Sequence, residues 1–206
     1  MLKVKMLDDP WTDGETKNIL YQNPNFSFNT GVTILLGRNG AGTTTLLKGI
    51  QDHCKTNCIP CFYYDNYTQG GSTAKSEYGF LGDFDSLCNT IFHSEGEQLY
   101  YNFCKQVSKI GGFCKKHEND KVLVICLDAL DSGLDCEGIH QLLDCFNLII
   151  SDNKDKEVYI IIAANNYGLI RNQTCLDVKT GKTKIFNTYE DFENFILNIY
   201  KEERNK

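Results

Sequence analysis

Apolar residues along the chain follow a strand-like pattern in several separate segments. "MLKVKML" at the start and "NFSFNTGVTILLG" from Asn25 carry short or alternating apolar runs, which predict strands. "KVLVICLD" and "EVYIIIAANN" are uninterrupted apolar runs, typical of strands that are buried on both faces of a sheet. Two further segments, "CFYYDNY" and the hairpin "CLDVKTGKTKIF" with its turn at Thr180-Gly181, complete the predicted strands.

Apolar residues at helical spacing occupy the stretches between these strands. The predicted helices are residues 44–53, a segment that ends at Gly111 and Gly112, residues 138–150, and a last helix that begins at Thr188. Strands that alternate with helices around buried runs predict an α/β fold with a mostly parallel central sheet and flanking helices. At 206 residues, the simplest organisation is one domain over residues 1–206.

Charge and composition narrow the possible partners. The formal net charge is −6, which argues against binding of nucleic acid by bulk electrostatics, although a local basic patch stays possible. The first ten residues do not form a signal peptide, and no apolar stretch is long enough to span a bilayer. We therefore expect a cytoplasmic protein that does not enter a membrane.

Ten cysteines fit a reduced compartment, and three of them form the one cluster that suggests metal. In "HCKTNCIPC", Cys54, Cys58 and Cys61 stand beside His53 at a spacing that suits zinc or an iron–sulfur cluster. A second ligand pair at a defined distance does not follow, so free thiols are the simpler interpretation.

The segment "ILLGRNGAGTTTLLKGI" has the order strand, glycine-rich loop, helix, which is typical of a phosphate-binding loop. The backbone N–H groups of the loop can converge on phosphates, and the helix N-terminus adds partial positive charge. The residues that would form this cradle are Gly37, Asn39, Gly40, Ala41, Gly42 and Thr43, with the hydroxyl of Thr44 placed to bind magnesium and Thr45 next to it. An ordinary strand-to-helix glycine turn is the alternative for the loop taken alone.

A second feature strengthens the nucleotide interpretation. Asp128 ends the buried run "VLVICLD", where a carboxylate can hold magnesium directly or through water. With "SEGEQ" at Ser94–Gln98 upstream and "SGLD" at Ser132–Asp135 downstream, the chain resembles the ATP-binding cassette superfamily of ATPases, within its soluble repair and chromosome-maintenance branch. Gly37–Leu46 resembles the Walker A loop, Asp128 the Walker B aspartate, "SEGEQ" the signature motif and "SGLD" the D-loop.

The resemblance implies a fold, a ligand and an assembly. It implies the P-loop NTPase sandwich of this superfamily, in which an antiparallel strand group at the N-terminus accompanies the mostly parallel sheet. It also implies ATP and magnesium bound between two chains that pair head to tail. Ser94, Gly96 and Glu97 would then contact the nucleotide of the partner chain, and Asp135 of the D-loop would lie at the same interface. Ser94 with Glu97 three residues on is also a capping box, and both interpretations can hold together.

Two loop residues are further candidates for contact with the nucleotide or its metal. Gln69, which follows the predicted strand "CFYYDNY", is similar to the Q-loop glutamine that reaches the metal and the attacking water; an exposed loop glutamine is the alternative. Trp11, in the loop before the glycines, is the candidate to stack on adenine, and a tryptophan that shields the core from solvent is the alternative.

The chain departs from the family pattern at three catalytic positions. Thr43 replaces the lysine that neutralises phosphate charge, Ala129 replaces the glutamate after Asp128, and Asn165 and Asn166 stand where a histidine is expected. These groups act on transition-state charge and on the attacking water, so we expect slow or absent hydrolysis. Either asparagine could still bond phosphate or water, and Arg38 or Lys48, close to the loop in sequence, could supply a cation, although Lys48 is on the helix and is expected to point away.

Two hypotheses of different classes follow. The first is a nucleotide switch or regulatory subunit that binds ATP and magnesium and forms a homodimer. The second is an interaction module that has kept the fold and lost the ligand. Thr44, Asp128 and the two flanking motifs favour the first, because an interaction module has no chemical use for them.

Overall fold

The computed structural model describes residues 1–6, 20–38, 40–66 and 95–204. Its central sheet has six strands in the order β4-β5-β6-β3-β7-β8. All neighbouring pairs are parallel except β7 and β8. The strands are β3 (Gly31–Leu36), β4 (Cys61–Asp65), β5 (Val122–Asp128), β6 (Glu157–Ala163), β7 (Thr174–Asp177) and β8 (Thr183–Lys184). A separate antiparallel pair, β1 (Leu2–Lys5) and β2 (Asn25–Phe28), confirms the predicted N-terminal strand group.

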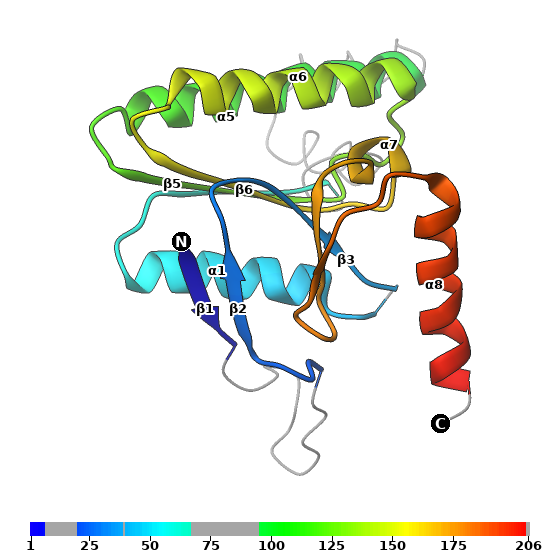
Figure 1. Cartoon of the computed structure of the whole chain (residues 1–206). Coiled ribbons are helices and arrows are strands. Elements are labelled where there is room, and N and C mark those ends of the chain that lie inside the picture. The colour runs from blue at the N-terminus through cyan, green and yellow to red at the C-terminus, as the bar shows by residue number, and fades with distance from the viewer. Residues whose placement is uncertain (7–19, 39, 67–94, 205–206) are drawn as a thin grey trace, which may run out of the picture.

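Helices cover both faces of this sheet (Figure 1). On one face lies α1 (Thr43–Thr56), and on the other lie α5 (Glu95–Lys116) and α6 (Cys136–Asp152). The short α7 (Tyr167–Ile170) follows β6, and α8 (Tyr189–Arg204) stands at the side. The predicted α/β fold with a mostly parallel sheet and flanking helices is therefore confirmed.

The handedness of crossovers explains which helix covers which face. The chain moves from β3 to the edge strand β4 through α1, and then returns toward the centre through α5 and α6. Right-handed crossovers in opposite directions place their helices on opposite faces. In open α/β sheets, ligands bind beyond the carboxyl ends of the strands where the direction of winding changes, here next to β3.

Two apolar clusters form the core, one on each face. One cluster packs α5 and α6 against the sheet and contains Ile110, Leu142 and Phe146. The other packs α1 and the β1–β2 pair against the opposite face and contains Leu46, Leu47 and Ile50. Strands β5 and β6 contribute to both clusters, which explains their uninterrupted apolar sequences.

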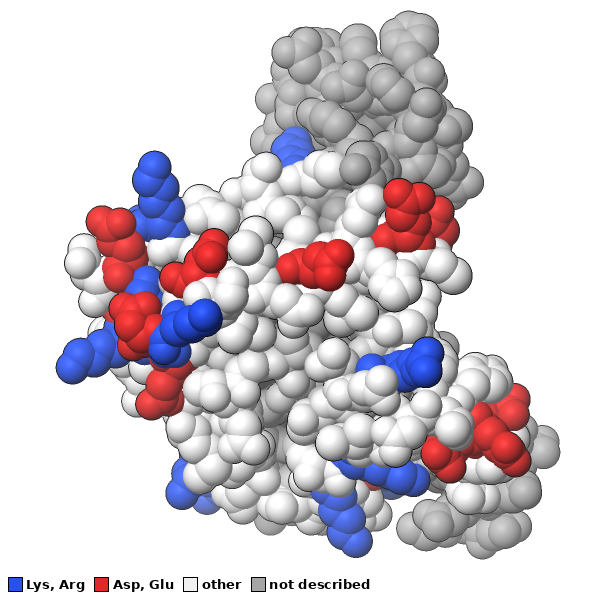
Figure 2. Space-filling view, turned by 45° about the horizontal axis from the view of Figure 1, so that its top comes forward, with Lys and Arg blue, Asp and Glu red and all other residues white. Residues whose placement is uncertain are grey.

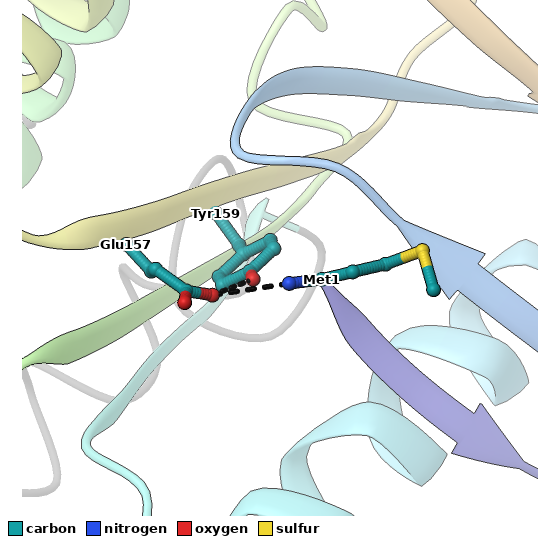
Figure 3. Close-up of polar contacts among 3 residues, drawn as sticks. All are labelled: Met1, Glu157 and Tyr159. Carbon is teal, nitrogen blue, oxygen red and sulfur yellow. Dashed lines mark hydrogen bonds and ion pairs between the residues drawn. The ribbon is translucent and has the colours of Figure 1, made fainter.

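The N-terminus is tied to the central sheet by a polar contact. The ammonium group of Met1 lies 3.1 Å from Oε2 of Glu157, and the hydroxyl of Tyr159 donates to the same carboxylate oxygen (Figure 3). The hydrogen bond from Tyr159 is the main reason that the pKa of Glu157 lies below its ordinary value. The contact joins β1 to β6, although Glu157 is too exposed for a large effect on stability.

One predicted helix end is wrong. Gly111 and Gly112 do not stop their helix, because α5 continues to Lys116. Glycine costs about 1 kcal/mol relative to alanine in a helix interior, and the apolar contacts of Ile110 and Phe113 with the core outweigh that cost. Helix α1 likewise extends beyond the predicted residues 44–53 at both ends.

Two structural findings concern possible partners. Within the part of the chain that the structure describes, we find no helix with both the length and the apolar character that a bilayer crossing requires. On the face shown in Figure 2, the described acidic and basic residues are mixed rather than gathered by sign. This face therefore gives no support to electrostatic binding of nucleic acid.

Candidate functional site

The start of α1 has the features of an anion-binding site. Strand β3 ends at Leu36, and α1 begins at Thr43 with Gly42 as its N-cap. Within the described part of the chain no side chain caps this end, and the first turn has no acidic residue. The first N–H groups of a helix lack partners within the helix, and the helix dipole favours negative charge there. Phosphate is therefore a suitable ligand for this end of α1.

Gly42 is required by both its conformation and its neighbours. Its φ is 94°, in the region that residues with a side chain rarely adopt, and an added Cβ would lie 2.5 Å from Leu20 Cδ2. The hydroxyl of Tyr21 donates a hydrogen bond of 2.7 Å to the carbonyl of Gly42. Sequence analysis missed Tyr21 because it contacts the loop from 21 residues away. The loop is therefore held from outside as well as by its own glycines.

Thr44 and Asp128 lie together beside this loop, although they are 84 positions apart in the sequence. Asp128 is the last residue of β5 and is 7% exposed. Burial raises the pKa of Asp128, while a hydrogen bond from the Thr44 hydroxyl lowers it. A hydroxyl and a carboxylate are ligands that magnesium prefers.

Asp65 is a second buried carboxylate at the same edge of the sheet. It is the last residue of β4 and is paired in register with Asp128 on β5. Its negative charge contributes to the raised pKa of Asp128. Sequence analysis missed Asp65, because only the register of β4 on β5 brings the two strand ends together. The Tyr63 hydroxyl is buried and has no hydrogen-bond partner among the described residues, and burial, followed by the charges of Asp128 and Asp65, raises its pKa.

Lys48 is a charged residue of α1 whose effect extends to this site. It lies on α1 four residues after Thr44, and its positive charge lowers the pKa of Asp128. Residues four apart share a helix face, so Lys48 follows Thr44 on the side of α1 that faces the end of β5. The charge of Lys48 therefore acts on this site, although the sequence predicts that its side chain points away from the loop.

Thr43 and Ala129 are the positions at which the sequence resemblance predicts a lysine and a glutamate. Thr43 is the first residue of α1, and its methyl group would be 3.3 Å from a Cβ placed on Gly37, so this side chain lies over the start of the loop. Ala129 directly follows Asp128 with a φ of 52°, which is uncommon for alanine. Its N–H donates to the carbonyl of Ala163, and its side chain offers no group that orients water.

Asp131 connects the two loops that follow β5 and β6. Its Oδ2 accepts hydrogen bonds from the backbone N–H groups of Asn165 (3.0 Å) and Asn166 (2.8 Å). The side chain of Asn166 caps α7 by accepting from the N–H of Gly168 at 2.8 Å. Asn165 is exposed. Of the two asparagines, only Asn166 uses its side chain to cap a helix in these contacts.

Asp135, predicted to contact nucleotide, is the N-cap of α6. Its Oδ1 accepts a hydrogen bond of 2.8 Å from the N–H of Gly138. We expect Asp135→Ala to lower the free energy of unfolding by about 1 kcal/mol, because the cap is lost. Asp135→Asn keeps an accepting oxygen and should keep most of the stability. Urea unfolding of both variants checks this, and an equal loss in the two would contradict the capping role.

Several predicted residues cannot be placed. Trp11, Asn39, Gln69 and Ser94 lie outside the described residues. Gly96 and Glu97 fall in the first turn of α5, which begins at Glu95. Their predicted contacts with nucleotide stay predictions.

Of the candidate metal ligands among the cysteines, Cys54 and Cys61 are in contact, whereas Cys58 is exposed. Cys54 is buried on α1, and Cys58 is exposed in the turn after it. Cys61, at the start of β4, contacts the thiols of Cys54 and Cys126. The contact with Cys61 raises the pKa of Cys54, whereas the pKa of Cys61 is raised by the contact with Cys126 and lowered by the contact with Cys54. Among the described residues, no group of three or more His, Cys, Asp or Glu side chains is arranged to hold a metal ion.

The comparisons with known proteins concern the fold of the chain. No protein-family model matches the chain, and no curated protein matches it. The chain is similar to the structure of CbiO1 from Clostridium perfringens, part of the ABC transporter complex CbiONQ. The identity is 19% and the TM-score 0.47, over 93% of this chain and 90% of the other. A similarity at this level carries no conclusion about activity. The activity is inferred below from the geometry of the site.

The raised pKa of Asp128 leads to a prediction about stability. A carboxyl whose folded-state pKa is raised favours folding when protonated, and this contribution is lost as pH rises through the folded pKa. At neutral pH the buried charge therefore lowers stability. We expect Asp128→Asn to raise the thermal midpoint at pH 7, with a gain that shrinks as pH falls toward 4. Thermal melts across this range check it, and a destabilised variant at pH 7 would contradict it.

Proposed function

We propose that this chain binds ATP with magnesium at the loop between β3 and α1 and acts as a nucleotide switch or regulatory subunit with slow or absent hydrolysis. The observation that carries the proposal is the contact of Thr44 with Asp128 beside an uncapped helix N-terminus. This arrangement combines an anion site with two oxygen ligands for a cation. A Mg²⁺-bound polyphosphate has both charges.

The residues at the site fit this ligand. The backbone N–H groups from Gly40 to Thr45 would hold the phosphates, and the oxygens of Thr44 and Asp128 would hold magnesium. Magnesium, when bound, neutralises phosphate charge. Gly37 leaves room for the loop to fold back, because an added Cβ would lie 2.7 Å from Ala41 Cβ.

Slow hydrolysis follows from what the site lacks. The side chain of Ala129 cannot orient a water molecule, and Thr43 carries no charge. The Asn166 side-chain oxygen is bonded to the N–H of Gly168. Removing one such stabilising group commonly reduces an enzyme's rate by a hundredfold or more, on the order of 3 kcal/mol. A protein that holds ATP without rapid turnover suits a switch.

A thermal-shift experiment tests nucleotide binding. A ligand present at a hundred times its dissociation constant stabilises the native state by about 2.7 kcal/mol, so ATP with MgCl₂ should raise the thermal midpoint. Thr44→Val should remove the part of the shift that depends on magnesium. Thr56→Val is the matched control, because Thr56 lies at the far end of α1 and bonds the carbonyl of Asp52. If ATP produces no shift in the unaltered chain, the interaction module becomes the better hypothesis.

We further propose that ATP brings two chains together head to tail, with Ser94 and Gly96 of each contacting the nucleotide of the other. The support is the sequence resemblance, since one complete set of motifs suffices for a two-fold pair. Light scattering should show a dimer at saturating ATP and a monomer without it. Ser94→Arg should prevent the dimer while single-chain nucleotide binding persists. A chain that stays monomeric at saturating ATP contradicts the pairing.

A further inference from the structure

The position of Lys48 suggests a role at the nucleotide site. Lys48 is exposed on α1, one helical turn after Thr44. Long helical side chains extend back over the preceding turn, toward the N-terminus of their helix. The axial distance from Lys48 to Thr44 is about 6 Å, which a four-carbon lysine stem spans. The ammonium group can therefore reach the level at which α1 begins.

The charges near this end of α1 favour a cation there. Asp65 and Asp128 are buried side by side at the ends of β4 and β5. Helix α1 packs against both strands, and the Lys48 charge acts on Asp128. A polyphosphate at the start of α1 would add further negative charge, whereas Thr43, at the position facing the loop, is neutral. An ammonium group from Lys48 would reduce this repulsion.

We propose that Lys48 supplies the cationic contact to the terminal phosphates of a nucleoside triphosphate that Thr43 does not supply. The inference rests on the proposed function and identifies a residue that determines affinity at that site. Lys48 contacts the ligand from the side of Thr44 and Asp128. A charged hydrogen bond of this kind corresponds to roughly a tenfold or larger change in affinity.

Binding titrations with a fluorescent ATP analogue and MgCl₂ test the role of Lys48. Lys48→Ala should weaken binding at least tenfold, and Lys48→Arg should restore it to within about threefold of the unaltered chain. Lys55→Ala is the matched control, because Lys55 is also exposed on α1 but lies two turns farther from the loop. It should leave binding unchanged. Thermal melts without nucleotide show whether each variant is folded.

A second variant pair separates a phosphate contact from a general effect of charge. If Lys48 fills the missing position, Lys48→Ala should weaken binding less when Thr43→Lys is also present, because two groups that serve one phosphate are not additive. Additive effects of the two changes would overturn the shared role.

Other results also overturn the proposal. Unchanged binding in Lys48→Ala would show that the ammonium does not reach the phosphates. Tighter binding in Lys48→Ala would show that the ammonium competes with magnesium for Asp128. In both cases the unaltered chain binds ATP and the proposed function stands. An unaltered chain that binds no ATP would instead refute the proposed function, and this inference with it.

Discussion

Thr43→Lys is expected to tighten ATP binding by about 10- to 100-fold. The physical reason is the neutral side chain at the first position of α1, directly over the start of the loop. One charge-assisted contact with phosphate is worth roughly 1.5 to 3 kcal/mol. The measurement is a titration with ATP and MgCl₂ at fixed ionic strength.

Thr56→Lys is the matched control for this change. Thr56 is exposed at the last position of the same helix, so this variant adds the same charge far from the loop. It should leave the affinity nearly unchanged at physiological salt. Equal gains in the two variants would indicate general attraction rather than a phosphate contact. Weaker binding by Thr43→Lys would show that the loop does not accept a lysine at this position.

Gly42→Ala is expected to lower the free energy of unfolding by about 2 to 5 kcal/mol. The left-handed backbone costs a residue with a side chain about 1 to 2 kcal/mol, and overpacking adds roughly 1 to 3 kcal/mol. The new Cβ would lie 2.5 Å from Leu20 Cδ2 and 2.9 Å from the Tyr21 hydroxyl. Because that hydroxyl holds the Gly42 carbonyl, the change should also disturb the start of α1.

Gly40→Ala separates the two causes. Gly40 also has a left-handed φ, of 84°, but nothing lies within 4 Å of its added Cβ. We expect this variant to lose only the backbone contribution, about 1 to 2 kcal/mol. Urea unfolding of both variants without nucleotide measures the difference. Equal losses would mean that Leu20 and Tyr21 move aside at no cost.

Elements whose signals are local were predicted well. The buried runs that became β5 and β6, and the loop between β3 and α1, depend on residues close together in sequence. The N-cap at Thr188 is also a local feature, because its hydroxyl accepts a hydrogen bond of 3.2 Å from the N–H of Asp191, three residues later. Helix α5 was the exception: its glycines predicted an end, but contacts with the core continued the helix.

The sequence by itself determined the glycine loop, the aspartate that ends a buried strand, and the residues Thr43, Ala129, Asn165 and Asn166 at positions where the family resemblance predicts a lysine, a glutamate and a histidine. Periodicity and glycine spacing specify these features locally. Tertiary structure alone decided that Asp65 lies beside Asp128, that Tyr21 holds Gly42, and that the charge of Lys48 acts on Asp128. Strand register and helix packing create these contacts between residues far apart in the chain, and one sequence carries no separate signal for them.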